Sequence, residues 1–186
     1  MPIQSAHTIL TERLSLRPYH EADFEPLYRL WTHNQIREWI FGEEPIPDKR
    51  GRQAIEDSRT SFAKWGFGQW SIRRQNEEAV IGFCGLLVAG DAFRDDHLVQ
   101  ADAAELYYGL VPSEWSKGLI TEAAKAVLRY GLERCGVIVA LVDEENRASR
   151  RVIETLGFTF IKTVEDEGEL VRYYQISSDA VPPTTG

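Results

Sequence analysis

An alternation of strand-like and helix-like segments in the second half of the chain constrains the fold more than any other feature. The run Glu105 to Val111 is strand-like, and a turn from Pro112 to Gly118 leads into a helix with apolar residues at helical spacing. A β-branched strand, Val137 to Val142, and a second helix follow. Asn146 is placed to cap that helix and Gly157 to end it. This order is typical of a sheet with helices packed on its faces.

The turn before the first of these helices is unusual for a helix start. The first N–H groups of a helix lack internal partners and carry partial positive charge, which acidic residues usually complement. Here the entry residues are Ser116, Lys117 and Gly118, and no acid appears before Glu122. A lysine at the positive end of the helix dipole is destabilising by about 0.3–1 kcal/mol, whereas an anion bound at the same end is stabilising. The turn indicates a phosphate-binding site; an ordinary turn with a solvated lysine is the alternative.

The chain contains three notable blocks, which are Thr11–Pro18, Trp115–Ala123 and the segment from Asn146 to Phe158. Together they resemble the GNAT superfamily of N-acetyltransferases, and its RimJ/RimL-like branch most of all. The segment Trp115–Ala123 is similar to the loop that holds the acyl-CoA pyrophosphate in that family. Asn146, Ser149 and the Leu-Gly-Phe triplet from Leu156 resemble its second CoA-side signature, and Thr11–Pro18 resembles its opening strand. The blocks occur in the family's order, and the resemblance covers most of the chain.

The chain departs from the family pattern at three positions. Ile120 stands where the family has Ala or Gly, and Ser116 where it has Gly; either change could narrow the pyrophosphate site or weaken CoA binding. Many members carry a tyrosine, their general acid, at the position of Ile153. The RimJ/RimL-like branch often has an aliphatic residue there, so the resemblance leaves the acid unassigned.

Length and composition bound the class of protein. The chain has 186 residues, 43% of them hydrophobic, and we expect a single domain over residues 1–177 and a disordered tail over residues 178–186. No apolar run approaches the ~20 residues of a membrane span, and the N-terminus does not resemble a signal peptide. Cys84 and Cys135 form no ligand motif, so we expect buried free thiols and a cytoplasmic location.

The charge balance disfavours some partners. A net charge of −8 speaks against nucleic acid or an anionic membrane, and it is compatible with a cationic acceptor. Positive charge is concentrated near the two helix starts, at Lys117, Arg147, Arg150 and Arg151. If both starts point to one side of the sheet, these residues could face an anionic cofactor.

The remaining periodicity completes the fold prediction. It predicts strands and helical pieces over residues 13–19, 23–32, 36–40, 48–65, 69–74, 80–88, 158–164 and 169–177. The predicted class is α/β in the sense of a mixed (α+β) sheet flanked by helices. The resemblance implies the GNAT acyl-CoA N-acyltransferase fold, in which two neighbouring strands splay apart and the acyl-pantetheine arm enters the gap.

Other ligand motifs are weak. Gly66-x-Gly68-x-x-Ser71 lacks the third glycine of a dinucleotide fingerprint and precedes a strand instead of following one. The four histidines show no metal-ligand spacing, and the acidic loop 91–102 lacks the Gly and Glu that a calcium loop needs. No metal site is predicted.

Acetyl transfer to an amine, which the resemblance implies, needs a base, a polarised carbonyl and a protonated leaving thiolate. Glu105 resembles the family's base at the start of its strand; an exposed strand-edge carboxylate is the alternative. A backbone N–H near Leu110 or Val111 is expected to hold the carbonyl. Ser149 is the candidate acid, and a serine that only caps its helix is the alternative.

The cofactor that the resemblance implies is acetyl-CoA, with CoA as product. Lys117 and the amides of Gly118 to Thr121 would bind the pyrophosphate, Asn146 would contact pantetheine, and Arg150 is a candidate for the 3′-phosphate. The cofactor-binding residues predicted in full are Leu110, Val111, Trp115, Ser116, Lys117, Gly118, Leu119, Ile120, Thr121, Asn146, Ser149 and Arg150.

The predicted function is acetyl-CoA-dependent N-acetylation of a primary amine. The acceptor stays open between a protein N-terminus of the ribosomal-protein type, an amino acid or polyamine, and an antibiotic amine. A catalytically silent acyl-CoA sensor of the same fold and an α/β protein that binds another phosphorylated ligand are the competing classes. Monomer and homodimer are equally compatible with the sequence. Most tryptophans are expected in the core, with one or two of Trp31, Trp39, Trp65 and Trp70 lining the acceptor pocket.

Overall fold

The computed structural model describes residues 7–40, 42, 44–89, 103–166 and 169–178. Its strands are β1 (Ile9–Leu10), β2 (Leu14–Pro18), β3 (Gln69–Arg74), β4 (Val80–Val88), β5 (Ala104–Leu110), β6 (Val137–Asp143), β7 (Thr159–Asp166) and β8 (Glu169–Ser177). Its α-helices are α1 (Phe24–Trp31), α2 (Asn34–Arg37), α3 (Asp48–Trp65), α4 (Leu119–Leu132) and α5 (Arg147–Thr155). The predicted bounds of α3, β3, β4 and β8 are confirmed, β7 begins one residue later than predicted, and β1 was not predicted.

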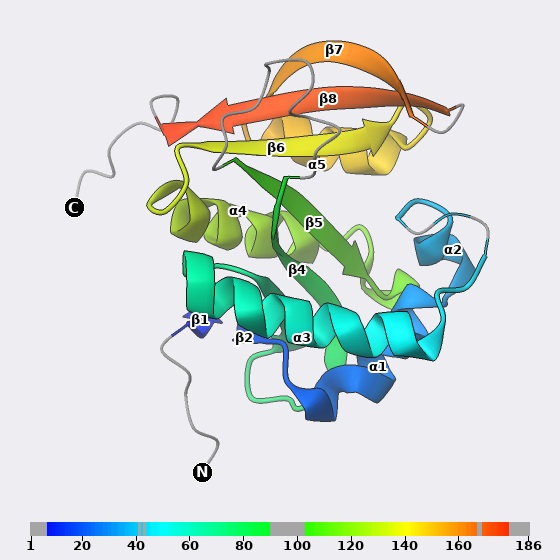
Figure 1. The fold of residues 1–186 in the computed structure, drawn as a ribbon, viewed down its shortest axis with the longest axis vertical. Helices are drawn as coiled ribbons and strands as arrows, with labels where there is room; N and C mark the ends of the chain where they lie inside the picture. Colours follow the sequence, from blue (N-terminus) through cyan, green and yellow to red (C-terminus); the bar gives the residue numbers. More distant parts are fainter. Residues whose placement is uncertain (1–6, 41, 43, 90–102, 167–168, 179–186) are drawn as a thin grey trace.

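The strands described form one mixed sheet in the order β1-β2-β3-β4-β5-β6-β8-β7 (Figure 1). Neighbouring strands are antiparallel throughout except at the centre, where β5 and β6 run parallel. This arrangement confirms the predicted mixed sheet.

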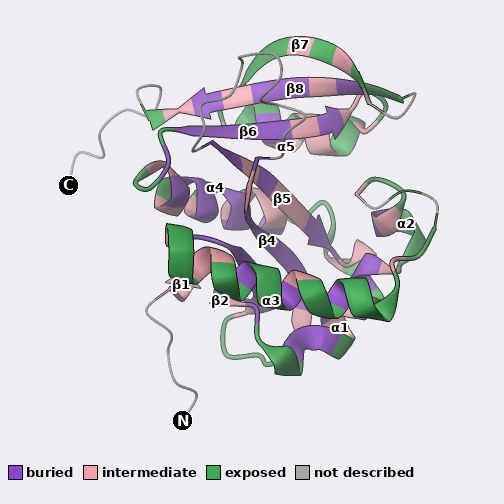
Figure 2. Ribbon diagram, viewed as in Figure 1, coloured by how far each residue is buried: buried purple, intermediate pink, exposed green. Residues whose placement is uncertain are grey.

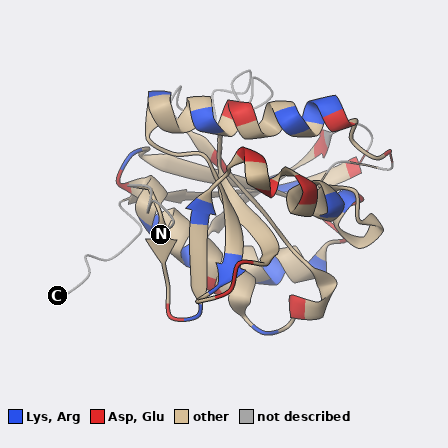
Figure 3. Cartoon of the chain, turned by 90° about the horizontal axis from the view of Figure 1, so that it is seen from below, with Lys and Arg blue, Asp and Glu red and all other residues tan. Residues whose placement is uncertain are grey.

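Helices cover both faces of the sheet (Figures 1 and 3), and the two larger hydrophobic clusters lie beneath them. On one face, α1 buries Leu27 and Trp31 against Phe83 of β4. On the other, α4 and α5 bury apolar residues such as Val127 and Ile153 against the sheet. The helical spacing of these residues puts each apolar stripe on one helix face, which is why each helix covers the sheet.

Helix α3 is the outermost layer over the first core. Its buried residues are Gly51, Ile55 and Ser58, and most of the rest of the helix is exposed (Figure 2). Charges of both signs alternate along it (Figure 3), with Arg52 2.9 Å from Asp48 and with similar pairs further along the helix. Exposed pairs of this kind contribute about 0.3–0.5 kcal/mol each, so burial against α1 and the sheet must supply most of the helix's stability.

The central parallel pair is short, and this feature positions the site. Strands β4 and β5 pair from Gly82↔Leu110 to Val88↔Ala104, the whole length of β5. Strands β5 and β6 pair only at Ala104↔Ile138 and Glu105↔Val139. Beyond Glu105 they diverge, as Figure 1 shows. The predicted splay of two neighbouring strands is therefore confirmed.

Residues 179–186 of the predicted tail lie outside the described residues, whereas the Ser178 N–H donates to the Gly136 carbonyl at 3.1 Å. Within the described ranges, no helix combines the length and apolar character needed to cross a membrane.

Candidate active site

A cavity of about 850 Å³ occupies the gap between the diverging strands. It is walled by β5, the start of α4, the end of β6, the start of α5 and the region of α2. The predicted site residues that line it are Glu105, Leu110, Trp115, Ser116, Gly118, Leu119, Ile120, Thr121, Asn146 and Ser149. Three predicted site residues, Val111, Lys117 and Arg150, do not line it.

The start of α4 leaves its backbone amides open. Its N-cap is Gly118, which has φ +73° and no side chain to accept a hydrogen bond. Ser116 also adopts a left-handed conformation, with φ +60°. Two left-handed residues within three positions turn the chain so that the first amides of α4 face the cavity that Leu119 to Thr121 line. This geometry fits an anion.

Glu122, the acid in the first turn of α4, connects the loop before α4 to the opening segment of the chain. Its carboxylate accepts hydrogen bonds from Thr11 Oγ1 at 2.6 Å and from Arg13 Nε at 2.6 Å. Arg13 also donates to the Lys117 carbonyl at 2.9 Å. Burial raises the pKa of the Glu122 carboxyl, but these hydrogen bonds outweigh burial and leave it lowered. The opening segment of the chain therefore holds the loop.

Lys117 points outward from the loop. Its Nζ lies 3.1 Å from the Glu114 carboxylate, and that carboxylate also pairs with Arg74. Burial raises the pKa of Glu114, but the hydrogen bonds from Lys117 and Arg74 leave it lowered. The Lys117 side chain is 47% exposed. Such exposed pairs contribute about 0–1 kcal/mol, so Lys117 could leave Glu114 for a phosphate at small cost.

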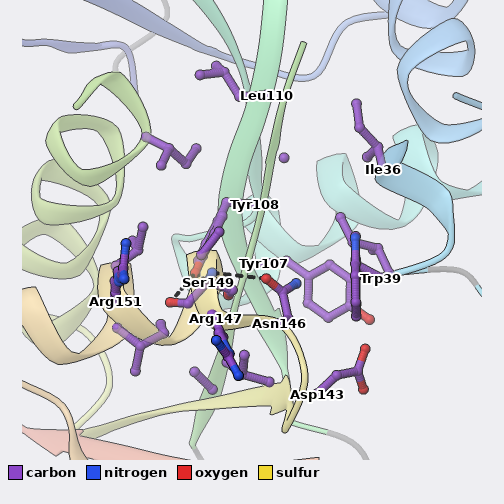
Figure 4. A pocket seen from close by; sticks show the side chains of 18 of the residues that line it. Ile36, Trp39, Tyr107, Tyr108, Leu110, Asp143, Asn146, Arg147, Ser149 and Arg151 are labelled. Carbon is purple, nitrogen blue, oxygen red and sulfur yellow. Dashed lines mark hydrogen bonds between the residues drawn. The ribbon is translucent and has the colours of Figure 1, made fainter. Parts of the chain in front are cut away.

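The start of α5 is capped, as predicted. Asn146 Oδ1 accepts a hydrogen bond from the Ser149 N–H at 3.0 Å. Arg150 turns away from the cavity and donates to the Glu144 carbonyl at 3.1 Å. Its neighbours Arg147 and Arg151 line the cavity instead (Figure 4). The sequence indicated positive charge near this helix start, but it did not show which arginines face inward.

Backbone direction decides which amides of β5 face the gap. The Val111 N–H donates to the Ile81 carbonyl across the β4–β5 pair at 2.9 Å. Because N–H groups of a strand alternate in direction, those of Leu110 and Tyr108 point to the opposite side, into the gap. The Leu110 carbonyl accepts from Trp115 Nε1 at 2.6 Å, which fixes the loop to the strand. The sequence predicted that a backbone N–H near Leu110 or Val111 holds the carbonyl. In the structure the Leu110 N–H faces the gap and the Val111 N–H does not.

Tyr108 is a site residue that sequence reasoning missed. Its hydroxyl lies 2.6 Å from Ser149 Oγ, and Figure 4 shows the two side chains together. Burial of the hydroxyl raises the pKa of the Tyr108 phenol well above its ordinary value, although the bond to Ser149 lowers it in part. The available signal was period-two alternation, which puts Tyr108 on the same strand face as Leu106 and Leu110.

Glu105 and Tyr107 lie on the other face of β5. A side chain at Gly109 would meet Phe83 and Ile36, so this face looks toward α1 and α2. Ile36, Trp39 and Asp143 line the cavity there as well (Figure 4). Among the tryptophans, Trp31 and Trp70 are buried as expected, whereas Trp39 lines the cavity and Trp65 is exposed outside it.

Comparison with known proteins identifies the family. A family model described as an acetyltransferase (GNAT) domain matches residues 13–159. This chain is a member of the GNAT family. As such, it is an acetyl-CoA-dependent N-acetyltransferase, as predicted. The uncapped α4 start and the β5 amides that face the gap fit the pyrophosphate and the pantetheine arm of acetyl-CoA.

Individual relatives agree with the family. YoaA of Bacillus subtilis (strain 168), an uncharacterized N-acetyltransferase, is 24% identical over 165 residues, which cover 88% of this chain and 85% of YoaA. RimL, a ribosomal L7/L12 alpha-N-protein acetyltransferase solved with coenzyme A, shares the fold with a TM-score of 0.75 at 18% identity, covering 94% of this chain and 100% of RimL. Mycobacterium smegmatis RimJ, in complex with CoA-disulfide, shares it with a TM-score of 0.71 at 19% identity, covering 91% and 84%. The predicted likeness to RimJ and RimL is confirmed at the level of the fold.

In the part of the chain that the structure describes, no group of three or more His, Cys, Asp or Glu side chains could hold a metal ion.

Proposed function

We propose that this enzyme acetylates a primary amine with Glu105 as the base and Ser149 as the group that assists the leaving sulfur. The gap between β5 and β6 carries the proposal. Glu105 lies where the two strands are last paired, and Ser149 lines the same cavity from α5. Glu105 lies on one face of β5, and the Ser149 hydroxyl of α5 contacts Tyr108 on the other face. This placement suits a reaction in which the amine attacks from one side and the thiolate leaves on the other.

Backbone amides and nearby arginines are placed to bind acetyl-CoA, the acetyl donor. The amides at the start of α4 would hold the pyrophosphate, and Arg147 and Arg151 add positive charge nearby. The Tyr108 amide lies about 10 Å from Glu105 along the strand and the Leu110 amide about 17 Å. The Tyr108 amide is therefore the better placed to receive the negative charge that develops on the carbonyl oxygen. The Leu110 amide would hold the pantetheine arm.

We propose a protein N-terminal amine as the acceptor. A terminal amine has a pKa of about 7.7–8.0, against about 10.4 for lysine, so it needs less help from a base at neutral pH. Trp39 is 41% exposed, so the acceptor wall reaches the surface, as an extended peptide requires. Carboxylates from Glu105 and Asp143 suit an ammonium group. RimL, an alpha-N-protein acetyltransferase that shares this fold, adds support.

The test is release of free CoA thiol across an acceptor panel. The panel contains peptides with free N-termini, the same peptides with blocked N-termini and an internal lysine, polyamines and aminoglycosides. We expect the free N-terminal peptides to be the best substrates. Turnover that is highest with a polyamine or an aminoglycoside would replace the acceptor assignment, and CoA binding without turnover of any amine would make the protein a sensor.

The base is tested in the same assay. Glu105→Gln keeps the shape of the side chain and removes its proton affinity, so kcat should fall by roughly 10²–10⁴-fold while acetyl-CoA affinity stays the same. The loss should shrink as pH rises, because more of the amine is then already neutral. Glu56→Gln, on the outer face of α3, is the matched control. A change confined to KM would recast Glu105 as a residue that binds the acceptor.

A further inference from the structure

The contact between Tyr108 and Ser149 joins β5 to α5 across the donor side of the cavity. The two hydroxyl oxygens lie 2.6 Å apart, within the range of a good O–H···O bond. The Ser149 backbone is fixed as well, because its N–H donates to Asn146 Oδ1 at 3.0 Å. Ser149 is thus held at both its amide and its side chain.

The direction of this hydrogen bond decides what Ser149 can do. A serine hydroxyl has one proton, so a serine that donates to Tyr108 has none left for the cavity. The Tyr108 proton has two acceptors within reach, Ser149 Oγ at 2.6 Å and the Ser149 carbonyl at 3.4 Å. The shorter contact is the stronger one. Either hydroxyl can donate across the 2.6 Å contact. When the phenol donates to Ser149 Oγ, the Ser149 proton is left for the open side of the cavity.

We propose that Tyr108 is a positioning residue that directs the Ser149 hydroxyl proton toward the sulfur of bound CoA. The inference rests on the proposed role of Ser149 and adds the residue that makes this role possible. Ile153, on the next turn of α5, is fully buried hydrocarbon and has no proton to donate. Tyr108 thus acts through Ser149 from the neighbouring strand.

The proton balance requires neither hydroxyl to ionise. As the amine attacks, its N–H proton passes to Glu105, and the carbon–sulfur bond breaks with its electron pair left on sulfur. The Ser149 O–H stabilises the thiolate by a hydrogen bond to a charged acceptor, which is stronger than a neutral one. The thiolate takes a proton from solvent on release, and Glu105 returns its proton to solvent.

The first test measures the thiol of bound CoA and needs no amine. Thiolate absorbance is followed against pH on CoA-saturated protein, with desulfo-CoA-saturated protein as the reference. A donor aimed at sulfur should raise the acid dissociation constant of the bound thiol about tenfold over free CoA. Tyr108→Phe should bring it back toward the free value, and Ser149→Ala should do so fully.

A matched control separates positioning from packing. Tyr174→Phe removes another buried phenol that contacts α5, at 3.4 Å from Glu154, and Tyr174 does not line the cavity. It should leave the bound thiol unchanged. A fluorinated tyrosine at 108 keeps the ring and makes the hydroxyl a stronger donor, so it should raise the dissociation constant further even if Tyr108→Phe folds poorly.

Kinetics supply the second test. Tyr108→Phe should lower kcat by roughly 10- to 100-fold, less than the 10²–10³-fold cost of losing a direct donor, with KM for acetyl-CoA unchanged. In a Ser149→Ala background the same change should have no further effect, because the pair acts as one unit. The proposal would be overturned if Tyr108→Phe left the dissociation constant of the bound thiol unchanged. It would also be overturned if the losses in kcat from Tyr108→Phe and Ser149→Ala were additive. If the dissociation constant of the bound thiol depends on Tyr108 but no amine is turned over, the positioning role of Tyr108 stands and the proposed function is rejected.

Discussion

Two helices point their N-termini at the cavity, and they begin in different ways. Helix α4 begins after Gly118, which has no side chain to cap it, whereas α5 begins after Asn146, which accepts the Ser149 N–H. Both starts carry the same partial positive charge. Only α4 leaves its amides without a side-chain acceptor. The difference teaches that one start is built to receive an anion and the other to hold a side chain in place.

Charged neighbours extend the comparison. At α4 the acid of the first turn, Glu122, is turned toward Arg13 and away from the anion site. At α5 the first turn contains no acid, and Arg147 and Arg151 line the cavity. Cations at a helix start are unfavourable by about 0.3–1 kcal/mol unless an anion is nearby. Both starts therefore favour the bound state, α4 through open amides and α5 through its arginines.

The largest effect should come from the cofactor itself. Acetyl-CoA at 100 times its dissociation constant should raise the free energy of unfolding by about 2.7 kcal/mol, measured by thermal melting. Hydrogen exchange should then slow at the first amides of α4, from Leu119 to Thr121, and much less at the Ser149 amide, which is already bonded. Equal protection from exchange at both helix starts would contradict the view that only the α4 start binds the anion.

Loss of the α5 cap should have the next largest effect. Asn146→Ala should lower the free energy of unfolding by about 1 kcal/mol, as the loss of an N-cap side chain does, measured by urea denaturation. Asn146→Asp keeps an acceptor for the Ser149 N–H and is the control, with stability near that of the parent. If both variants are equally destabilised, the cap is not what Asn146 contributes.

The smallest effect is expected at Lys117. Lys117→Ala should change the free energy of unfolding by less than about 1 kcal/mol, because its pair with Glu114 is exposed. Acetyl-CoA affinity should fall several-fold at low salt and much less at high salt, since an exposed charge contact is screened. Lys125→Ala, an exposed lysine further along α4, should leave affinity unchanged. Calorimetric titration at two salt concentrations compares the variants, and a salt-independent loss would contradict the charge contact.

Lys117 also has a pH signature. The Glu114 pKa is lowered in the folded protein, so the contribution of Glu114 to stability is present above its unfolded pKa and is lost as pH falls through the folded value. Lys117→Ala removes one of the donors that lower this pKa. The variant should therefore lose less stability than the parent on acidification.

Local chemistry explains what the sequence could predict. The cap at Asn146 and the bounds of α3 depend on neighbouring residues, so composition and spacing were enough to place them. The two-residue strand β1 was missed because it is too short for periodicity to register. The splay came from the family resemblance, since pairing between distant strands leaves no local pattern.

The orientation of side chains explains what the sequence could not. Arg150 turns out and Arg151 turns in because the rotation of α5 is set by its packing on the sheet. Trp39 and Trp65 have similar sequence surroundings, yet one lines the cavity and the other lies outside it. Tyr108 finds Ser149 only because two elements far apart in sequence meet across the gap.

The short β5–β6 pairing also affects how the molecule unfolds. Strands β6, β7 and β8 and helix α5 come from one continuous segment, residues 137–177. Strand pairing joins this segment to β5 at only two residue pairs. The other connections are the packing of α4, the hydrogen bond between Tyr108 and Ser149, and a small cluster in which Ala89 and Ala103 pack against β6 and β8. Acetyl-CoA bound in the gap would contact both parts, so it would act as a link between two units of folding. The free enzyme and the complex should therefore differ in folding cooperativity as well as in stability.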